Sequence, residues 1–203
     1  MRHSDVKIEK SCDLSSRGTH FGAKRRWSMP KESDVVECKV AAIDPFFLEA
    51  TEAVTELCIK HKKPYVTIDC RHDSRLHQHA AINVVSKECT GSDAYKGKSL
   101  EEIYALLVEN TDGLVIITSG EKDMIYGRKG QSPKRMKPFS VEVKSTLGAG
   151  DTFKAGCVYG LLKGFSDDQI VRFASACSAI AISRFPLPLN PPTMDEVQKL
   201  LNS

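Results

Sequence analysis

The stretch STLGAGDTFKAG, residues 145–156, sets three small residues and a carboxylate in front of an apolar helical pattern. At its centre, Gly148, Ala149 and Gly150 form a turn whose backbone N–H groups no large side chain covers. The first N–H groups of a helix have no partner within the helix, and its N-terminus carries a partial positive charge. The stretch therefore predicts an anion-binding turn at the start of a helix.

Asp151 directly follows this turn and falls in the first turn of the expected helix, close to any bound anion. A carboxylate beside a phosphate is repulsive unless it has a chemical task, such as accepting the proton of an attacking hydroxyl. Phosphoryl transfer needs both parts, namely donors for the developing charge and a base for the nucleophile. The same residues also fit a plain helix start in which Asp151 is only a favourable charge, so the local pattern leaves both interpretations open.

Around this stretch, apolar segments alternate with helical patterns from residue 39 onward. This alternation predicts an open α/β sheet, and nearly continuous apolar runs are typical of parallel strands covered on both faces. Such sheets bind ligands beyond the carboxyl ends of their strands, where Asp44, Asp69, Glu88 and Gly120 stand. The expected strands are 39–44, 64–70, 82–88 and 113–120, and the expected helices are 45–63, 99–111 (with a Ser99/Glu102 capping box), 150–163, 167–184 and 193–201.

The segment that follows the expected strand 113–120 has a different sequence pattern. DMIYGRKG (123–130) and FSVEVKST (139–146) are strand-like pieces on either side of a basic loop, QSPKRMK (131–137). We expect the two pieces to form a small antiparallel ribbon.

Length, composition and charge are those of an ordinary globular protein. The chain has 203 residues, 41% of them hydrophobic and 27% charged, with a net charge of +3. This charge is too small to predict a nucleic-acid partner, because such proteins cluster many more Lys and Arg residues on one face. The sequence has no apolar run of membrane-spanning length and no signal-peptide core, so we expect a cytoplasmic protein without a membrane partner.

The cysteines and histidines predict no metal centre. Seven cysteines occur without a CxxC pair, which favours free thiols in a reducing compartment. His72, His77 and His79 lie close together, but their spacing is loose and polar residues separate them. We therefore expect a surface helix there instead of a set of metal ligands.

The longer stretch STLGAGDTFKAGCVYGLLKG (145–164) resembles the C-terminal signature of the PfkB (ribokinase-like) family of carbohydrate kinases. The resemblance implies an α/β fold with a mostly parallel central sheet, helices on both faces and a small antiparallel ribbon. It also implies ATP-dependent phosphoryl transfer to a hydroxyl of a small carbohydrate. In the family this turn is the anion hole and its Asp is the general base, which assigns the catalytic roles to Gly148, Ala149, Gly150 and Asp151.

Further segments match the family in the same order. VIITSGEKDMIYG (115–127) looks like the strand and turn that help to bind the nucleotide, and VVSKE (84–88) like the segment whose glutamate organises Mg²⁺ through water. The family often binds a monovalent cation such as K⁺ near the signature, although Ser145 stands here in place of the usual Asp. The resemblance assigns nucleotide contacts to Thr118, Gly120, Glu121, Thr146, Gly148, Gly150, Cys177 and Ala181, and indirect binding of Mg²⁺ to Glu88.

The resemblance covers residues 34–203, the expected nucleotide-binding and catalytic core, and leaves residues 1–33 as the remnant of a lid. The glycine-rich first signature of the family is absent, so the chain resembles the C-terminal two-thirds of a kinase. Three functions follow from the resemblance: a sugar kinase, a nucleoside kinase of the same family, or a truncated or divergent nucleotide-binding protein without kinase activity. The resemblance implies a small sugar or nucleoside as the binding partner. It also implies a homodimer in which the lid forms the contacts between the two copies.

Overall fold

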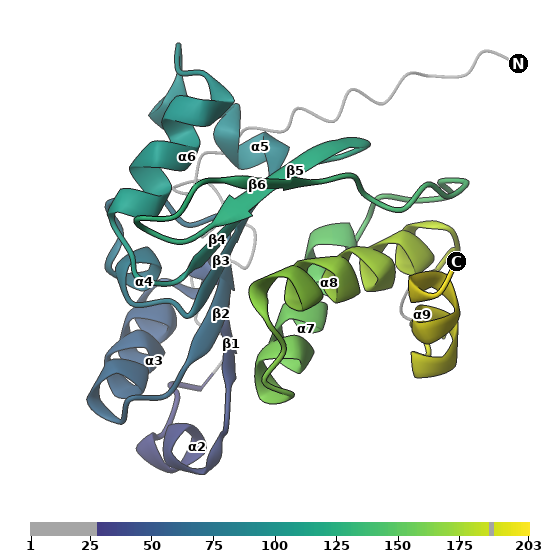
Figure 1. Ribbon diagram of the computed structural model, residues 1–203. Coiled ribbons are helices and arrows are strands. Elements are labelled where there is room, and N and C mark those ends of the chain that lie inside the picture. Colours follow the sequence, from purple (N-terminus) through teal and green to yellow (C-terminus); the bar gives the residue numbers. More distant parts are fainter. Residues whose placement is uncertain (1–27, 187–188) are drawn as a thin grey trace, which may run out of the picture.

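A six-stranded sheet organises the protein, and its strands lie side by side in sequence order (Figure 1). The computed structural model describes residues 28–186 and 189–203. The first four strands run parallel, and the last two continue the sheet as antiparallel neighbours. The strands are β1 (Ala41–Ile43), β2 (Tyr65–Ile68), β3 (Ile82–Val85), β4 (Leu114–Ser119), β5 (Lys122–Gly127) and β6 (Lys134–Met136).

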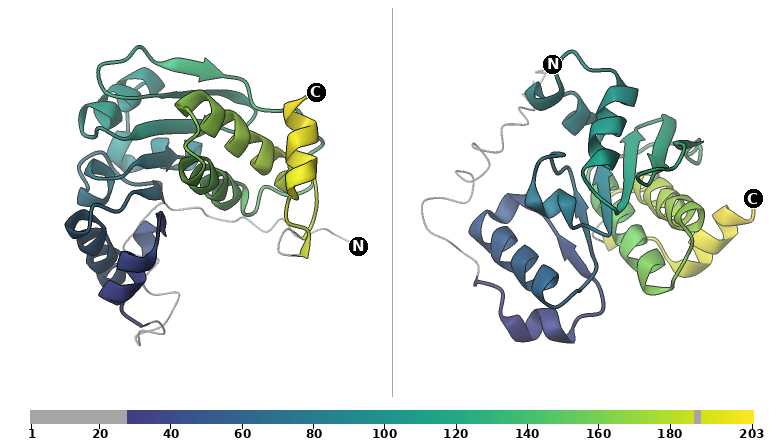
Figure 2. Two further views of the ribbon diagram at one scale, coloured as in Figure 1. Left: turned by 60° about the horizontal axis from the view of Figure 1, so that its bottom comes forward. Right: turned by 60° about the vertical axis from the view of Figure 1, so that its left-hand side comes forward.

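Helices cover both faces of this sheet, so the expected α/β fold is confirmed (Figures 1 and 2). On one face, apolar residues of β2 to β5 form a core with α7 and α8, and α9 packs against the far side of α8. On the other face, α3 and α4 pack on β1 and β2, while α5 and α6 pack on β3 to β5. The helices are α2 (Glu32–Glu37), α3 (Glu49–Lys60), α4 (Arg75–Gln78), α5 (Lys87–Thr90), α6 (Leu100–Glu109), α7 (Ala149–Leu162), α8 (Asp167–Ile182) and α9 (Met194–Leu201), with short 3-10 turns at Pro45–Phe47 (η1) and Asp93–Tyr95 (η2).

The strand register explains why the site forms at one edge of the sheet. Ile43 pairs with Thr67, Thr67 with Asn83, and Asn83 with Val115. Residues of β2 and β3 are buried on both faces, as continuous apolar parallel strands require. This register brings the carboxyl ends of the four parallel strands to the same edge.

The predicted helix start at residue 99 is confirmed. Ser99 caps α6 by accepting a hydrogen bond from the Glu102 backbone, and the Glu102 side chain accepts one from the Ser99 backbone in return. This reciprocal pair satisfies two N–H groups that the helix itself leaves unpaired.

The antiparallel ribbon forms, but its second strand is not where the sequence predicts it. β6 occupies residues 134–136 inside the expected loop, and residues 139–146 form no strand. The backbone N–H groups of Lys144 and Ser145 instead donate to the Ile182 carbonyl at the end of α8, at 2.8 and 3.1 Å. This segment therefore leads the chain from the sheet to the start of α7, a tertiary requirement that local alternation does not reveal.

The expected third strand is shorter than predicted. β3 ends at Val85, and Ser86 caps α5 by accepting a hydrogen bond from the Cys89 backbone. Glu88 therefore lies on a short helix just beyond the sheet edge.

The expectation that His77 lies on a surface helix is wrong, because its side chain is fully buried. Nδ1 of His77 accepts a hydrogen bond from the Asn83 side chain at 2.8 Å, so Nε2 carries the proton and donates to the Leu107 carbonyl at 2.8 Å. Burial lowers the pKa of His77, and nearby His72 lowers it further, against the opposing effect of the bond to Leu107. His77 is thus a neutral polar residue of the core.

The predicted N-terminal segment, residues 1–33, lies mostly outside the described residues. Its predicted boundary at residue 34 falls within α2, so the division of the chain stays a prediction. Among the described helices, none has both the length and the apolar character needed to cross a bilayer.

Candidate active site

The start of α7 has the geometry of an anion-binding turn. Gly148 is the N-cap residue with φ of 80°, a left-handed conformation that suits glycine, and no side chain caps the helix. Ala149 N–H donates to the Thr146 carbonyl at 3.2 Å. Within the described part of the chain, the N–H groups of Gly148, Gly150 and Asp151 have no acceptor. Three donors at the positive end of a 14-residue helix are thus available to an anion.

Close packing places this turn at the carboxyl edge of the sheet. A Cβ atom on Gly150 would lie 3.0 Å from Cδ1 of Ile68, the last residue of β2. From the other side, Ser178 of α8 donates a hydrogen bond to the Ala149 carbonyl at 3.1 Å. A small residue at position 150 therefore lets the helix start approach the strand end.

Asp151 projects from the first turn of α7 into solvent, with 76% of its side chain exposed. Its carboxylate neither caps the helix nor accepts a hydrogen bond from any described residue. The nearest cation is Lys154, at 3.9 Å. An exposed carboxylate beside free N–H donors can accept a proton from a group held at the turn.

Lys154 and Asp44 are site residues that the sequence reasoning missed as a pair. Lys154 is almost completely buried and forms an ion pair with Asp44, which directly follows β1. The spacing of Asp151 and Lys154 by three positions on one helix was the available signal, because such residues lie on the same face. The pairing with a residue 110 positions away was not readable from the sequence.

Asp69 joins the ends of β2 and β3. It adopts φ of 53°, and its carboxylate accepts a hydrogen bond from the Ser86 backbone at 2.7 Å. Asp tolerates this left-handed conformation better than most residues. Burial raises the pKa of the neighbouring Cys70 thiol to about 12, and the Asp69 and Asp44 carboxylates add to this effect while Lys154 opposes it. These charged groups therefore gather at one edge of the sheet.

The residues predicted to contact a nucleotide divide into two groups. Thr118 is the next-to-last residue of β4 and is half-buried, with its hydroxyl 3.5 Å from the Val85 carbonyl, and Gly120 turns the chain into β5 with φ of 65°. Glu121 and Thr146 are exposed, whereas Cys177 and Ala181 are buried. A ligand can therefore reach atoms of the first group, which consists of Thr118, Gly120, Glu121 and Thr146. The second group, Cys177 and Ala181, lies in the core behind the turn.

The residues predicted to act on cations lie close to the same edge. Glu88 is exposed in the first turn of α5. Ser145 precedes the turn, and its hydroxyl accepts a hydrogen bond from the Leu147 backbone at 3.2 Å.

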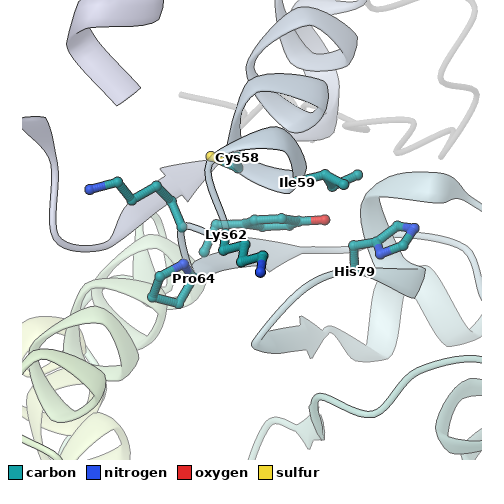
Figure 3. A pocket seen from close by; sticks show the side chains of 7 residues that line it. Cys58, Ile59, Lys62, Pro64 and His79 are labelled. Atoms are coloured by element: carbon teal, nitrogen blue, oxygen red, sulfur yellow. The ribbon is translucent and has the colours of Figure 1, made fainter. Parts of the chain in front are cut away.

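A hollow of about 300 Å³ lies at the opposite edge of the sheet (Figure 3). Lys62 and Pro64, which precede β2, line it together with Cys58 of α3 and His79, which follows α4. None of the predicted site residues lines this hollow. The candidate active site therefore lies at the other edge of the sheet and does not include this hollow.

The family model for pfkB carbohydrate kinases matches residues 26–187. This chain belongs to the pfkB family. The match covers the whole sheet and the C-terminal signature at residues 145–164 with the start of α7, so the predicted resemblance is confirmed. It begins eight positions before the boundary expected from the sequence.

Known proteins similar to this pfkB-family chain include kinases of sugars. A ribokinase of Haemophilus influenzae is 38% identical over 87 residues, 43% of this chain and 28% of the relative. The ribokinase of Arabidopsis thaliana, solved with ribose and ATP, superposes with a TM-score of 0.74 at 19% identity, covering 87% of this chain and 61% of that one. A structure from Escherichia coli, solved with ATP and Mg²⁺, gives a TM-score of 0.71 at 17% identity, covering 85% and 61%.

The pfkB-family chain spans only part of these proteins. The matches cover 28% to 34% of the curated relatives and about three-fifths of the solved structures. The whole relatives therefore contain a region that the present chain does not match.

Proposed function

We propose that this pfkB-family chain transfers the γ-phosphoryl group of ATP to a hydroxyl group of a small carbohydrate. The observation that carries the proposal is the pairing of free N–H donors at the Gly148 turn with the exposed Asp151 carboxylate one residue beyond the turn. Donors for the transferred phosphoryl and a base for the nucleophile are the two parts that this reaction requires.

The roles of the residues follow from their positions. Of the predicted donors, the N–H groups of Gly148 and Gly150, which have no acceptor among the described residues, contact the transferred phosphoryl group and stabilise the charge that develops on its oxygens, whereas the Ala149 N–H donates to the Thr146 carbonyl. Asp151 accepts the proton of the acceptor hydroxyl while the hydroxyl oxygen bonds to phosphorus and the bond to the bridging oxygen of ADP breaks. A backbone donor set needs no reorganisation during the reaction, because the helix already fixes it.

The nucleotide lies, in this proposal, along the edge between β4 and α8. Thr118, Gly120 and Glu121 border it from the β4–β5 turn, and Thr146 borders it from the segment before α7. Cys177 and Ala181 contribute through packing, since both are buried. Structures of the same fold were solved with ATP, which supports ATP as the nucleotide in this proposal.

The side chains near the turn fit a Mg²⁺ ion that the nucleotide phosphates hold for the most part. Among the described residues, no cluster of three or more potential ligand side chains converges. Mg²⁺ with few protein ligands takes its other positions from phosphate oxygens and water, and Glu88 would hold it through water. When bound, Mg²⁺ neutralises phosphate charge. A K⁺ ion would rest on backbone oxygens near Ser145, where the side chain is not acidic.

The test is acceptor-dependent release of ADP by the full chain with Mg²⁺, over a panel of sugars and nucleosides, with and without K⁺. Asp151→Asn should reduce turnover by a factor on the order of 10² to 10⁴, the usual contribution of a positioned general base. Asp195→Asn is the matched control, because Asp195 is also an exposed carboxylate in the first turn of a helix but lies on α9. Full turnover in Asp151→Asn would disprove the assignment of the base.

Two outcomes select the other candidate functions. Turnover with nucleosides alone would identify a nucleoside kinase. Binding of ATP without turnover of any acceptor would identify a nucleotide-binding protein without kinase activity. Assembly into a homodimer stays a prediction, which sedimentation of the chain would test.

A further inference from the structure

Lys154 is a buried cation at the edge of the candidate active site, and the proposed reaction gives it no role. It lies one helical turn after Asp151 on α7, and 7% of its surface is exposed. Its ammonium group donates a hydrogen bond to the Asp44 carboxylate and lies 3.9 Å from the Asp151 carboxylate. One buried positive charge thus faces carboxylates from two separate elements.

The stability of the fold does not explain this arrangement. Removing a lysine and a carboxylate from water costs several kcal/mol for each ion, and apolar side chains of similar volume often stabilise a protein at least as well. The other buried residues in this part of α7, Phe153, Gly156 and Cys157, are apolar. A lysine among them indicates an electrostatic task.

The charges nearby show what that task is. Asp44, Asp69 and Asp151 place three carboxylates around the ends of β1 and β2 and the start of α7. The N–H donors of the turn attract a phosphate, but carboxylates within a few ångströms repel it. A cation within 3.9 Å of two of them offsets part of this repulsion.

We propose that Lys154 is a positioning residue, which holds the Asp44 and Asp151 carboxylates beside each other and offsets their charge, so that an anionic phosphate can bind at the Gly148 turn. The inference rests on the proposed function, because it assumes that a nucleotide phosphate occupies the turn. It assigns Lys154 no contact with the reacting atoms.

The first measurement is the affinity of the full chain for Mg²⁺–ATP, by titration calorimetry. Lys154→Met should weaken binding on the order of tenfold, because a second uncompensated carboxylate then faces the phosphates. Lys163→Met is the matched control: it removes the same charge immediately after the other end of α7, where the ammonium group lies over the Tyr159 ring. This control should change the affinity by less than about twofold.

A second set of variants separates charge from packing. Asp44→Asn together with Lys154→Met restores the net charge of the site and should recover most of the affinity. Asp44→Asn alone should bind at least as tightly as the unaltered chain. The deficit of Lys154→Met should also shrink as salt is added, whereas a packing defect would not respond to salt.

Each variant is first checked for folding by circular dichroism and urea unfolding. Should Lys154→Met fail to fold, the Asp44→Asn variant and the double variant still differ only at position 154. The inference then requires tighter binding by Asp44→Asn than by the double variant.

The outcomes are distinct. Unchanged affinity in Lys154→Met, or a loss that neither salt nor the double variant reduces, overturns the inference and leaves the proposed function intact. Absence of Mg²⁺–ATP binding by the unaltered chain overturns the proposed function, and this inference with it.

Discussion

Gly148 combines two properties at one residue, a left-handed backbone and an N–H group that has no acceptor among the described residues. An alanine in this conformation costs on the order of 1 kcal/mol, and the strain acts on the turn that presents the donors. We expect Gly148→Ala to lose about 1 kcal/mol in the free energy of unfolding and to bind Mg²⁺–ATP more weakly. Urea unfolding and titration calorimetry measure the two effects.

Gly164 provides the control for this prediction. It follows α7 with φ of 69°, and a Cβ atom there would meet nothing within 4 Å. Gly164→Ala should therefore show a similar loss of stability without a loss of affinity. Equal losses of affinity in both variants would contradict the role of the turn.

His77 predicts how stability depends on pH. Its folded-state pKa is lowered by burial, so protons bind more readily to the unfolded chain, whose histidines have a pKa of about 6.5. The contribution of neutral His77 is complete above about pH 6.5 and is lost as the pH falls below that value. Urea unfolding from about pH 7.5 to about pH 5 should show this decline.

The matched variants are His77→Gln and His79→Gln, since His79 is exposed. His77→Gln should be less stable at neutral pH, because a buried hydrogen-bond pair is lost, but its stability should decline less on acidification. His79→Gln should follow the unaltered chain. An unaltered chain whose stability does not change over this pH range would refute the assignment.

Single residues show where sequence reasoning succeeds and where it stops. The positions of Gly148 and Asp151 at the start of α7 were predictable, because a helix start depends on neighbours within the same turn. Lys154 and His77 were not, because lysine and histidine are usually solvated, and their burial depends on partners far along the chain. The sequence shows the residue types but not which of them the fold encloses.

At the scale of elements, the contact between α7 and α8 depends on glycines. A Cβ atom on Gly156 would lie 2.7 Å from Cα of Ala174, whereas one on Gly160 would lie 2.9 Å from the side chain of Ile170. Backbone atoms cannot move aside as a side chain can. We expect Gly156→Ala to destabilise the fold by about 1–3 kcal/mol, in spite of the better helix propensity of alanine.

Gly160→Ala is the comparison, because Ile170 can adjust its side chain. It should cost less than Gly156→Ala in the free energy of unfolding, measured with urea at neutral pH. The reverse order would show that the backbone contact at Ala174 relaxes more readily than the side chain of Ile170.

Some elements were predictable because nearby residues specify them, whereas others depend on distant parts of the chain. The start of α6 was predictable because Ser99 and Glu102 specify it within four residues. The position of β6 was not, because residues 139–146 have a strand-like sequence, yet the chain there must reach the end of α8. Helix capping is a local property, whereas the pairing of a short edge strand depends on the rest of the sheet.

At the scale of the molecule, the parallel strands explain why distant residues form one site. Asp44, Asp69 and Gly120 end three different parallel strands or directly follow them, and the register brings these ends to a common edge. The sequence predicted this gathering from the rule for α/β sheets alone. It did not predict the ion pair across the site, because the rule places residues at an edge without specifying their contacts.

Ligand binding at this edge should change the stability of the whole chain. A ligand that binds only the folded state stabilises it, by about 2.7 kcal/mol at a concentration one hundred times its dissociation constant. Mg²⁺–ATP at that concentration should therefore raise the free energy of unfolding in urea by about this amount, because in the proposed function its phosphates occupy the donors of the Gly148 turn. Adenosine at the same concentration should stabilise the chain much less, since it lacks the phosphates. Equal effects of the two ligands would show that the turn does not bind phosphate, even if the nucleoside part binds nearby.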